Sequence, residues 1–337
     1  MLSKLRTICA LTIACLAGLN PSPGFGQEQA KHGSVEQMMA MLHAIDPYLP
    51  NEKLSSGKVE VFGSTSMDAM AHGWISGFKK FHPQTEVIVS AAGSEATFES
   101  LLKNPAGVGM LSRPVKDEEL LELKKRGLKD PAAFVVAREA LGVFVHSQNP
   151  VQTITGEQLR TIFTVGIHPG PLTWEIMGAK GEWAKKPLNI IARTQNSGTQ
   201  KFLADFVFCF CSLREGVSNH VSNAEVLKAV SDDPLSMAIC GLRSKGSNVR
   251  ALQLTADNKI VPSDDQSILE GHYPLTRPLT LVIDRGHEGV NAQAAQEFVH
   301  YALCRTGQTQ AVIDGFYPVD LPLLRAGLQK LGASQVR

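Results

Sequence analysis

Hydrophobic and polar positions change period repeatedly along the chain. Short apolar runs typical of buried strands are followed by turns rich in Gly, Ser or Thr, and then by apolar residues at helical spacing. The first such unit is an apolar run at 59–62, a turn at 63–66 and a predicted helix. The inward face of that helix would consist of Met67, Met70, Trp74, Phe78 and Phe81. Repetition of this unit predicts an α/β protein.

Further strands are predicted at six apolar runs: 86–89, 107–111, 133–136, 141–145, 187–192 and 278–283. The runs at 133–136 and 141–145 are interpreted as two strands with a few residues between them. Helices are predicted over 116–126, 155–163 and 292–303, and around Leu101. Another helix should follow residue 199, with Phe202, Phe206 and Val207 facing inward.

The first 26 residues have the pattern of a secretory signal peptide. Lys4 and Arg6 precede an apolar run at 8–19, and a polar segment with two prolines and a glycine follows it. A buried N-terminal helix is the alternative, but those prolines would end it abruptly. The sequence therefore predicts an exported, periplasmic protein. Residues 27–56 are expected to form an N-terminal arm that contributes little to any site.

The charge balance excludes some partners. The chain has 337 residues with 33 basic and 32 acidic side chains, and removal of the signal peptide leaves 31 basic residues. A nearly neutral chain without a basic stripe is not expected to bind nucleic acid or an anionic membrane surface. An anion would therefore be held by local groups. The 311 residues from 27 onward are enough for two domains.

Four cysteines follow the predicted signal peptide: Cys209, Cys211, Cys240 and Cys304. In an oxidising compartment one or two disulfides could form, with Cys240 or Cys304 as the partner of the closely spaced pair. A metal site at Cys209 and Cys211 is a weaker interpretation, because the two-residue gap and a second pair are missing. The pairing is left open.

Three turns combine Gly, Ser and Thr with the start of a helix, at 63–66, 93–94 and 196–199. A helix start has unpaired N–H groups and a positive dipole end, and hydroxyls add further donors, so converging starts could hold a tetrahedral oxyanion. Taken singly, each Ser or Thr is more simply an N-cap. Arg113 and Arg193 follow strands near these turns. Each could be a surface ion-pair residue, but Arg193 lies four residues before Ser197 and could form a two-pronged contact with an anion.

Motifs for catalysis are not found. The sequence contains no nucleophile elbow, no phosphate loop of the Walker type, no zinc-protease helix and no dinucleotide fingerprint. The histidines are scattered, and His82, His146 and His168 are interpreted as solvated or structural residues. We therefore expect no enzyme, no metal and no cofactor.

With these residues in place, the chain resembles the periplasmic phosphate-binding proteins that serve the high-affinity phosphate ABC importer. The resemblance extends from residue 62 to residue 318. The segments that carry it are 62–67, 92–94, 109–114, 116–118, 142–146, 149–150, 158–163, 173–174, 181–185, 193, 197–199, 273–278, 307–308 and 314–318.

The resemblance implies the two-lobed type II periplasmic-binding-protein fold, with an anion in the cleft between the lobes. Lobe 1 would comprise residues 57–138 and 275–337, and lobe 2 residues 139–274. Two crossing strands would join the lobes near 137–141 and 273–279, and closure would be a hinge motion. The implied ligand-binding residues are Thr65, Ser66, Ser94 and Arg113 in lobe 1, and Arg193, Ser197, Gly198 and Thr199 in lobe 2.

Two departures concern the identity of the anion. Well-known members have an aspartate near the end of the third strand that accepts the proton of hydrogen phosphate, where this chain has Ser112 and Arg113. Glu95 follows Ser94 and could be a replacement acceptor that sets selectivity, or it could repel a dianion. The implied function is that of a monomeric receptor that delivers phosphate or a related oxyanion to an ABC importer permease. A stand-alone exported binding module and a secreted phosphatase-like enzyme are the alternatives.

Overall fold

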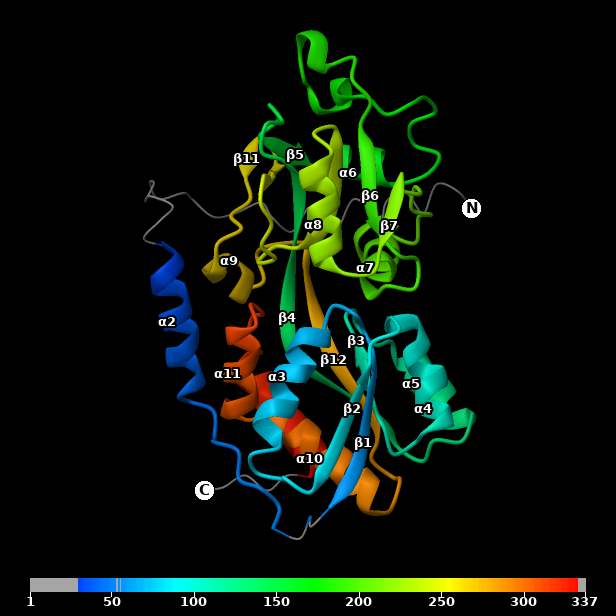
Figure 1. Ribbon diagram of the computed structural model, residues 1–337, viewed down its shortest axis with the longest axis vertical. Helices are drawn as coiled ribbons and strands as arrows, with labels where there is room; N and C mark the ends of the chain where they lie inside the picture. Colours follow the sequence, from blue (N-terminus) through cyan, green and yellow to red (C-terminus); the bar gives the residue numbers. More distant parts are fainter. Residues whose placement is uncertain (1–29, 53, 55, 333–337) are drawn as a thin grey trace.

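The computed structural model describes residues 30–52, 54 and 56–332. The predicted signal peptide, 1–26, lies outside these residues. The described chain forms two lobes stacked along the long axis and joined by two long strands, β4 and β12 (Figure 1). None of the described helices has the length and apolar character needed to cross a membrane.

Lobe 1 is built on the sheet order β2-β1-β3-β12-β4, in which β12 runs antiparallel to both its neighbours. Helices α3, α10 and α11 cover one face of this sheet, and α4 and α5 cover the other (Figure 1). The elements are α2 (Ala30–Leu42), β1 (Gly57–Gly63), α3 (Asp68–Phe78), β2 (Thr85–Ser90), α4 (Thr97–Lys103), β3 (Val108–Leu111), α5 (Asp117–Lys125), β4 (Pro131–His146), β12 (Thr276–Asp284), α10 (Val290–Leu303), α11 (Arg305–Ile313) and α12 (Leu321–Leu331).

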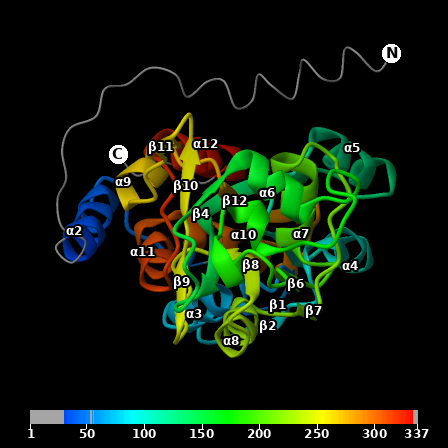
Figure 2. The same ribbon diagram turned by 90° about the horizontal axis from the view of Figure 1, so that it is seen from above.

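Lobe 2 continues the same sheet from the second half of β4 through β8, β6 and β7, while β9 pairs with β4. Helix α8 covers one face of these strands, and α6 and α7 lie on the other (Figure 2). A second, small sheet has the order β11-β10-β5. The elements are β5 (Thr153–Thr155), α6 (Gly156–Phe163), β6 (Asn189–Arg193), α7 (Gly198–Phe202), β7 (Ser218–His220), α8 (Asn223–Asp232), β8 (Ser236–Gly241), β9 (Val249–Ala251), β10 (Gln253–Ala256), β11 (Lys259–Ile260) and α9 (Asp265–Leu269).

The two strands predicted at 133–136 and 141–145 are one continuous strand, so that prediction was wrong. The first part of β4 pairs with β12 in lobe 1, and its last residues pair with β8 and β9 in lobe 2. The polar residues between the apolar runs stay extended because β12 pairs with them, with Arg277 opposite Glu139. β4 therefore crosses between the lobes where the sequence suggested a break.

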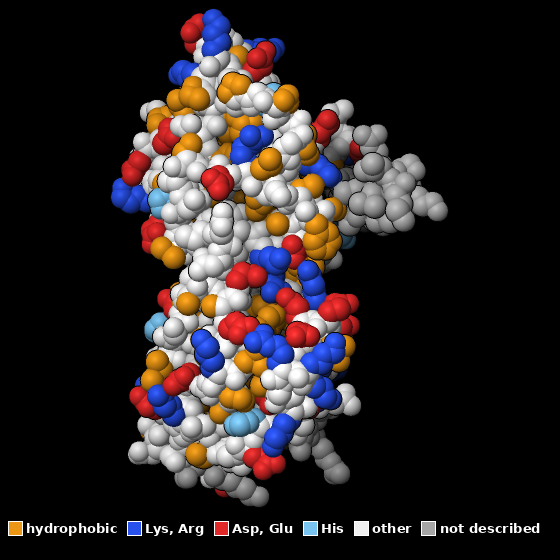
Figure 3. Space-filling model, turned by 90° about the vertical axis from the view of Figure 1, so that its right-hand side faces the viewer, with side chains coloured by type: hydrophobic (Ala, Val, Ile, Leu, Met, Phe, Trp, Pro, Cys, Tyr) orange, Lys and Arg blue, Asp and Glu red, His pale blue; other side chains and the backbone are white. Residues whose placement is uncertain are grey.

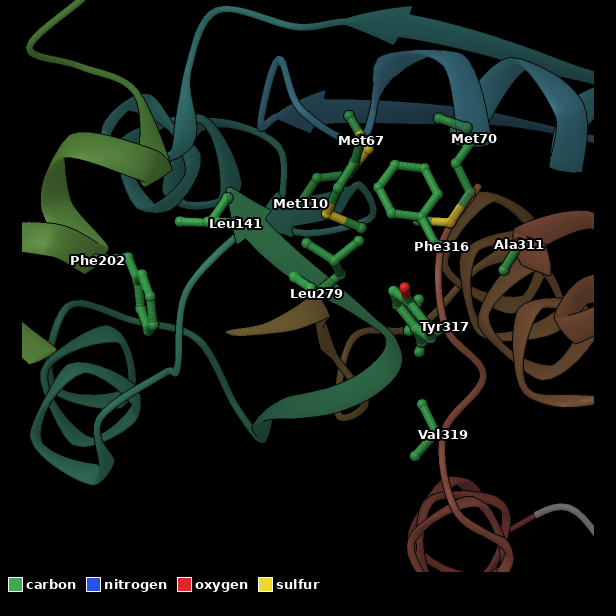
Figure 4. Close-up of a cluster of buried hydrophobic side chains, with 14 of the residues drawn as sticks. Met67, Met70, Met110, Leu141, Phe202, Leu279, Ala311, Phe316, Tyr317 and Val319 are labelled. Atoms are coloured by element: carbon green, nitrogen blue, oxygen red, sulfur yellow. The ribbon is translucent and has the colours of Figure 1, made fainter. Parts of the chain in front are cut away.

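The hydrophobic core follows the crossing strands from one lobe into the other. Met67 and Met110 of lobe 1 lie next to Leu279 of β12, and Leu141 continues the core along β4 (Figure 4). On the outside, the molecule narrows between the lobes, and acidic and basic side chains mix on the visible face of lobe 1 (Figure 3). A shared core makes the crossing strands a firm base for a site between the lobes.

The predicted N-terminal arm is packed into lobe 1. Met38 and Leu42 of α2 are buried in the core. Tyr48 is buried too, and its hydroxyl donates to Glu297 Oε1 at 2.6 Å and lies 2.5 Å from His82 Nε2. His82 is therefore a structural residue, as predicted. The arm is part of the lobe 1 fold.

Two further expectations are corrected around the start of α7. Phe202 is buried as predicted, but Phe206 is about one-third exposed, because the helix widens into a π-helical segment at Leu203–Val207. Cys209 is exposed, while Cys240 and Cys304, the expected disulfide partners, are buried in separate parts of the core and form no disulfide. The disulfide left open at the sequence level is therefore not formed.

Candidate anion-binding site

Arg193 is the last residue of β6 and lies where the two lobes meet. It is only 1% exposed. Within lobe 2, its Nη1 donates to Asn223 Oδ1 at 2.7 Å, and its other nitrogens donate to the carbonyls of His220 and Val221. Its Nη2 also donates to Thr65 Oγ1 of lobe 1 at 2.6 Å. Arg193 is thus held in place by lobe 2 and contacts the lobe 1 turn at 63–66, which was predicted to lie across the cleft from it.

Arg277 of β12 is a second arginine at the same boundary, and it is fully buried. Its Nε and Nη2 donate to Glu139 Oε2 of β4 at 3.0 and 2.7 Å. Nη2 also donates to Ser66 Oγ at 3.1 Å and to Thr199 Oγ1 at 2.9 Å. The buried Nη1 has no hydrogen-bond partner in the described part of the chain. Arg277 thus connects predicted ligand residues of both lobes.

Three serines of lobe 1 are buried together, and two of them, Ser94 and Ser112, face the start of α7. Ser64 Oγ donates to Ser112 Oγ at 2.9 Å, and Ser94 Oγ lies 3.4 Å from the same oxygen. We call Ser64, Ser94 and Ser112 the hydroxyl cluster. A Cβ atom on Gly198 would lie 2.2 Å from Ser112 Oγ and 2.4 Å from Ser94 Oγ. Only glycine permits this close approach of the lobes.

The start of α7 supplies the remaining predicted residues of lobe 2. Ser197 is the N-cap, and its Oγ accepts a hydrogen bond from the Gln200 N–H at 3.2 Å. The Ser197 hydroxyl therefore has the ordinary N-cap role, which was the simpler interpretation of this residue from the sequence. The N–H groups that follow a cap lack partners within the helix, so Gly198 and Thr199 present donors at the boundary.

Arg113 is buried beside two carboxylates. Its Nη1 and Nη2 donate to the two oxygens of Glu119 at 2.9 and 2.8 Å, and its Nε donates to Glu95 Oε1 at 3.2 Å. Glu119 also accepts the Lys116 N–H at the start of α5. The guanidinium of Arg113 is thus largely occupied by lobe 1, and direct contact of Arg113 with an anion stays a prediction. Glu95 has an arginine partner and is not a free carboxylate.

Charge at the boundary is unbalanced. Two buried arginines, Arg193 and Arg277, face one buried carboxylate, Glu139. Burial and the neighbouring Arg277 lower the pKa of Arg193 to about 10. Burial, reinforced by Glu139, raises the pKa of the Cys240 thiol beneath them, so Cys240 stays neutral. The excess positive charge can be offset by a bound anion.

The structure brings most of the predicted site residues together. Thr65, Ser66, Arg193 and Thr199 are joined by hydrogen bonds, Ser94 and Gly198 are in contact, and Ser197 caps the same helix. Sequence reasoning missed five residues: Ser64, Ser112, Glu139, Asn223 and Arg277. The available signal for Glu139 and Arg277 was that each is a charged residue next to an apolar strand run, where a buried ion pair can form. Among the described residues, no group of three or more His, Cys, Asp or Glu side chains is placed to hold a metal ion.

This geometry can be compared with known proteins. The family model described as "PBP superfamily domain" matches residues 50–306, which is most of the chain. The chain belongs to this superfamily. A curated relative is the phosphate-binding protein PstS of Pseudomonas aeruginosa, 29% identical over 298 residues, with 86% of this chain and 92% of the relative covered.

Solved structures agree on the fold. An ABC-type phosphate transport receptor from Vibrio cholerae is 21% identical with a TM-score of 0.61, and the match covers 78% of this chain and all of that one. A phosphate-binding protein from Stenotrophomonas maltophilia is 11% identical with a TM-score of 0.56, covering 82% and 94% of the two chains. The predicted type II fold and family resemblance are confirmed, and with them the prediction of a binding protein that is not an enzyme.

A cross-lobe ion pair outside the anion site provides a first test of closure. Lys116 Nζ of lobe 1 lies 2.9 Å from Asp205 Oδ2 of lobe 2 and faces the rings of Phe206 and Phe210. This contact forms only when the lobes meet, so Lys116→Met should weaken anion binding by about fivefold. That factor is the upper end of what a partly exposed ion pair contributes to a binding constant. Calorimetric titration would measure this.

Lys201→Met is the matched control for that variant. Lys201 Nζ lies 3.3 Å from the same Asp205 oxygen but belongs to lobe 2, so its loss leaves the cross-lobe contact in place. Burial raises the pKa of Asp205, but hydrogen bonds from Lys116 and Lys201 outweigh it and keep the pKa below its usual value. Equal affinities for the two variants would show that the pair does not contribute to closure.

Proposed function

We propose that this protein is a solute receptor that captures phosphate, or a related oxyanion, between its lobes. The observation that carries the proposal is the buried Arg193, held by lobe 2 and bonded to Thr65 of lobe 1. The two N–H groups of Arg193 that contact Thr65 and Ser66 of lobe 1 can bind two anion oxygens in their place, while hydroxyls and helix N–H groups bind the others. The eight residues predicted from the sequence, with Arg277 added, form the proposed site.

Related proteins support the ligand and the partner. One relative is a phosphate-binding protein, and a solved structure of the same fold is that of an ABC-type phosphate transport receptor. We accordingly assign to this chain a periplasmic location and delivery of the anion to an ABC importer permease. As a separate part of the proposal, the receptor acts as a monomer. The lobe boundaries at 138/139 and 274/275 are part of the same proposal, because they lie on β4 and just before β12.

Calorimetric titration with phosphate tests the proposal. We expect one binding site per chain and a rise in melting temperature with phosphate concentration, since a ligand that binds only the folded protein stabilises it. Closure should also reduce the radius of gyration in X-ray scattering when phosphate is added. Absence of both heat and thermal stabilisation with phosphate would refute the function as proposed.

A further inference from the structure

Arg277 has unused capacity to bind an anion. Its Nε and Nη2 are occupied by Glu139, Ser66 and Thr199, but its buried Nη1 has no partner among the described residues. A buried charged donor without a partner costs more free energy than an unpartnered neutral donor. The cost is relieved if the N–H groups of Nη1 meet an anion at the boundary that Ser66 and Thr199 already mark.

The carboxylates bonded to the arginines of this site are all engaged. Glu95 and Glu119 accept hydrogen bonds from Arg113. Glu139 accepts from Arg277 through Oε2 and from Asn223 through Oε1, the latter at 3.3 Å. Monohydrogen phosphate carries a proton that needs an acceptor, whereas sulfate carries none. A free carboxylate would accept the first and repel the second.

The hydroxyl cluster provides the remaining acceptors. A serine hydroxyl can donate or accept, so it can turn to suit either a bare oxygen or a protonated one. Ser64 Oγ already donates to Ser112 Oγ, and either oxygen can be the donor between Ser112 and Ser94. The hydroxyl cluster therefore does not distinguish an anion oxygen that carries a proton from one that does not.

From these contacts we infer that the site selects its anion by charge and tetrahedral shape, with Arg277 as a second cation beside Arg193. It therefore admits dianions that carry no proton, and sulfate is the simplest of these. The inference rests on the proposed function, since it concerns the same site. The ligands of this site would therefore be tetrahedral oxyanions as a class, and not hydrogen phosphate alone.

Competition between the two anions tests the inference. The protein would be titrated with phosphate, then with sulfate, and then with phosphate in the presence of excess sulfate. We expect sulfate to compete with a dissociation constant less than about 100-fold above that of phosphate. A site built to bond the proton of hydrogen phosphate would instead discriminate against sulfate by about 10⁴-fold or more. A larger ratio overturns the inference and leaves the proposed function intact. Failure of both anions to bind overturns both.

Arg277→Lys tests the role assigned to the second arginine. Lysine keeps the charge opposite Glu139 but lacks the second arm of the guanidinium, so phosphate and sulfate should both weaken about tenfold and by similar factors. Unchanged affinity for both anions, or a loss confined to phosphate, contradicts the inference. Should this variant fail to fold, the competition experiment on the unaltered protein still decides.

Arg138→Lys is the control for Arg277→Lys. Arg138 lies on β4 next to Glu139, but its side chain bonds to Leu269 and Asp320 away from the site. The same substitution at this position should leave both affinities unchanged. A tenfold loss in this variant as well would trace the effect to the crossing strands in general and overturn the role of Arg277.

Discussion

Replacing Arg193 by methionine should lower the affinity for phosphate by at least about 100-fold, because the loss of charge-assisted bonds to a desolvated anion is worth about 3 kcal/mol. The melting temperature of the anion-free protein should change little. Methionine is unbranched and apolar, and it fills the space of the aliphatic part of the arginine side chain. Calorimetry and thermal unfolding of the same samples would measure both quantities.

The small effect on stability follows from the pKa of Arg193. Its pKa in the folded protein is about 10, below the ordinary 12.5, because of burial and the nearby Arg277. Between these values the unfolded chain binds more protons than the folded one, so stability rises with pH there. At neutral pH the charged side chain therefore destabilises the anion-free fold. Its removal relieves that cost and offsets the lost bonds to Asn223 and Val221.

Arg250→Met is the matched control for Arg193→Met. Arg250 also belongs to lobe 2 and donates to backbone carbonyls, those of Asn149 and Val151, but it does not reach lobe 1. Its replacement should leave phosphate affinity unchanged. If Arg193→Met shows that same pattern instead, Arg193 is a structural residue and the proposed site is wrong.

The parts of the site that were predictable from the sequence are local. A turn with Ser, Gly and Thr before a helix has its geometry set by neighbouring residues, so Thr65, Ser94 and the start of α7 could be identified from short segments. Family resemblance then placed these turns opposite one another. Contacts such as that between Gly198 and the hydroxyl cluster depend on how closely the lobes meet, and no local pattern reports that distance.

Arg277 and Glu139 could not be predicted as a pair for a related reason. They are 138 residues apart in the chain and meet only through the antiparallel register of β12 and β4. Glu139, with Arg138 before it, led to the prediction of a break at 137–140, where the strand in fact crosses between the lobes. A charged residue between two apolar runs is compatible with a loop, and only its partner on the next strand makes it part of a sheet.

The behaviour of Arg113 shows a second limit. Its place after β3 favoured a role in the site, yet Glu119 at the start of α5 binds its guanidinium with both oxygens. Glu119 was recognisable only as a residue of a charged helix. Competition between an anion and a nearby carboxylate for one arginine is decided by side-chain geometry, which residue order does not contain.

Gly198→Ala should lower phosphate affinity by about 10- to 100-fold without weakening the fold. The new Cβ would lie about 2.2 Å from Ser112 Oγ and 2.4 Å from Ser94 Oγ, and it would also be 3.1 Å from Ser94 Cβ. Overpacking of this kind costs about 1–3 kcal/mol, and the protein can avoid it by keeping the lobes apart. In the open form, alanine in the first turn of α7 is a better helix former than glycine.

Gly156→Ala separates these two effects. Gly156 begins α6 behind the N-cap Thr155, just as Gly198 begins α7 behind Ser197, but a Cβ there would meet nothing within 4 Å. Both variants should unfold at or slightly above the temperature of the unaltered protein, because both replace a flexible residue at a helix start. Only Gly198→Ala should lose phosphate affinity and remain extended in X-ray scattering when phosphate is added. Equal affinity in the two variants would mean that the lobes close around the anion without the contact between Gly198 and the hydroxyl cluster.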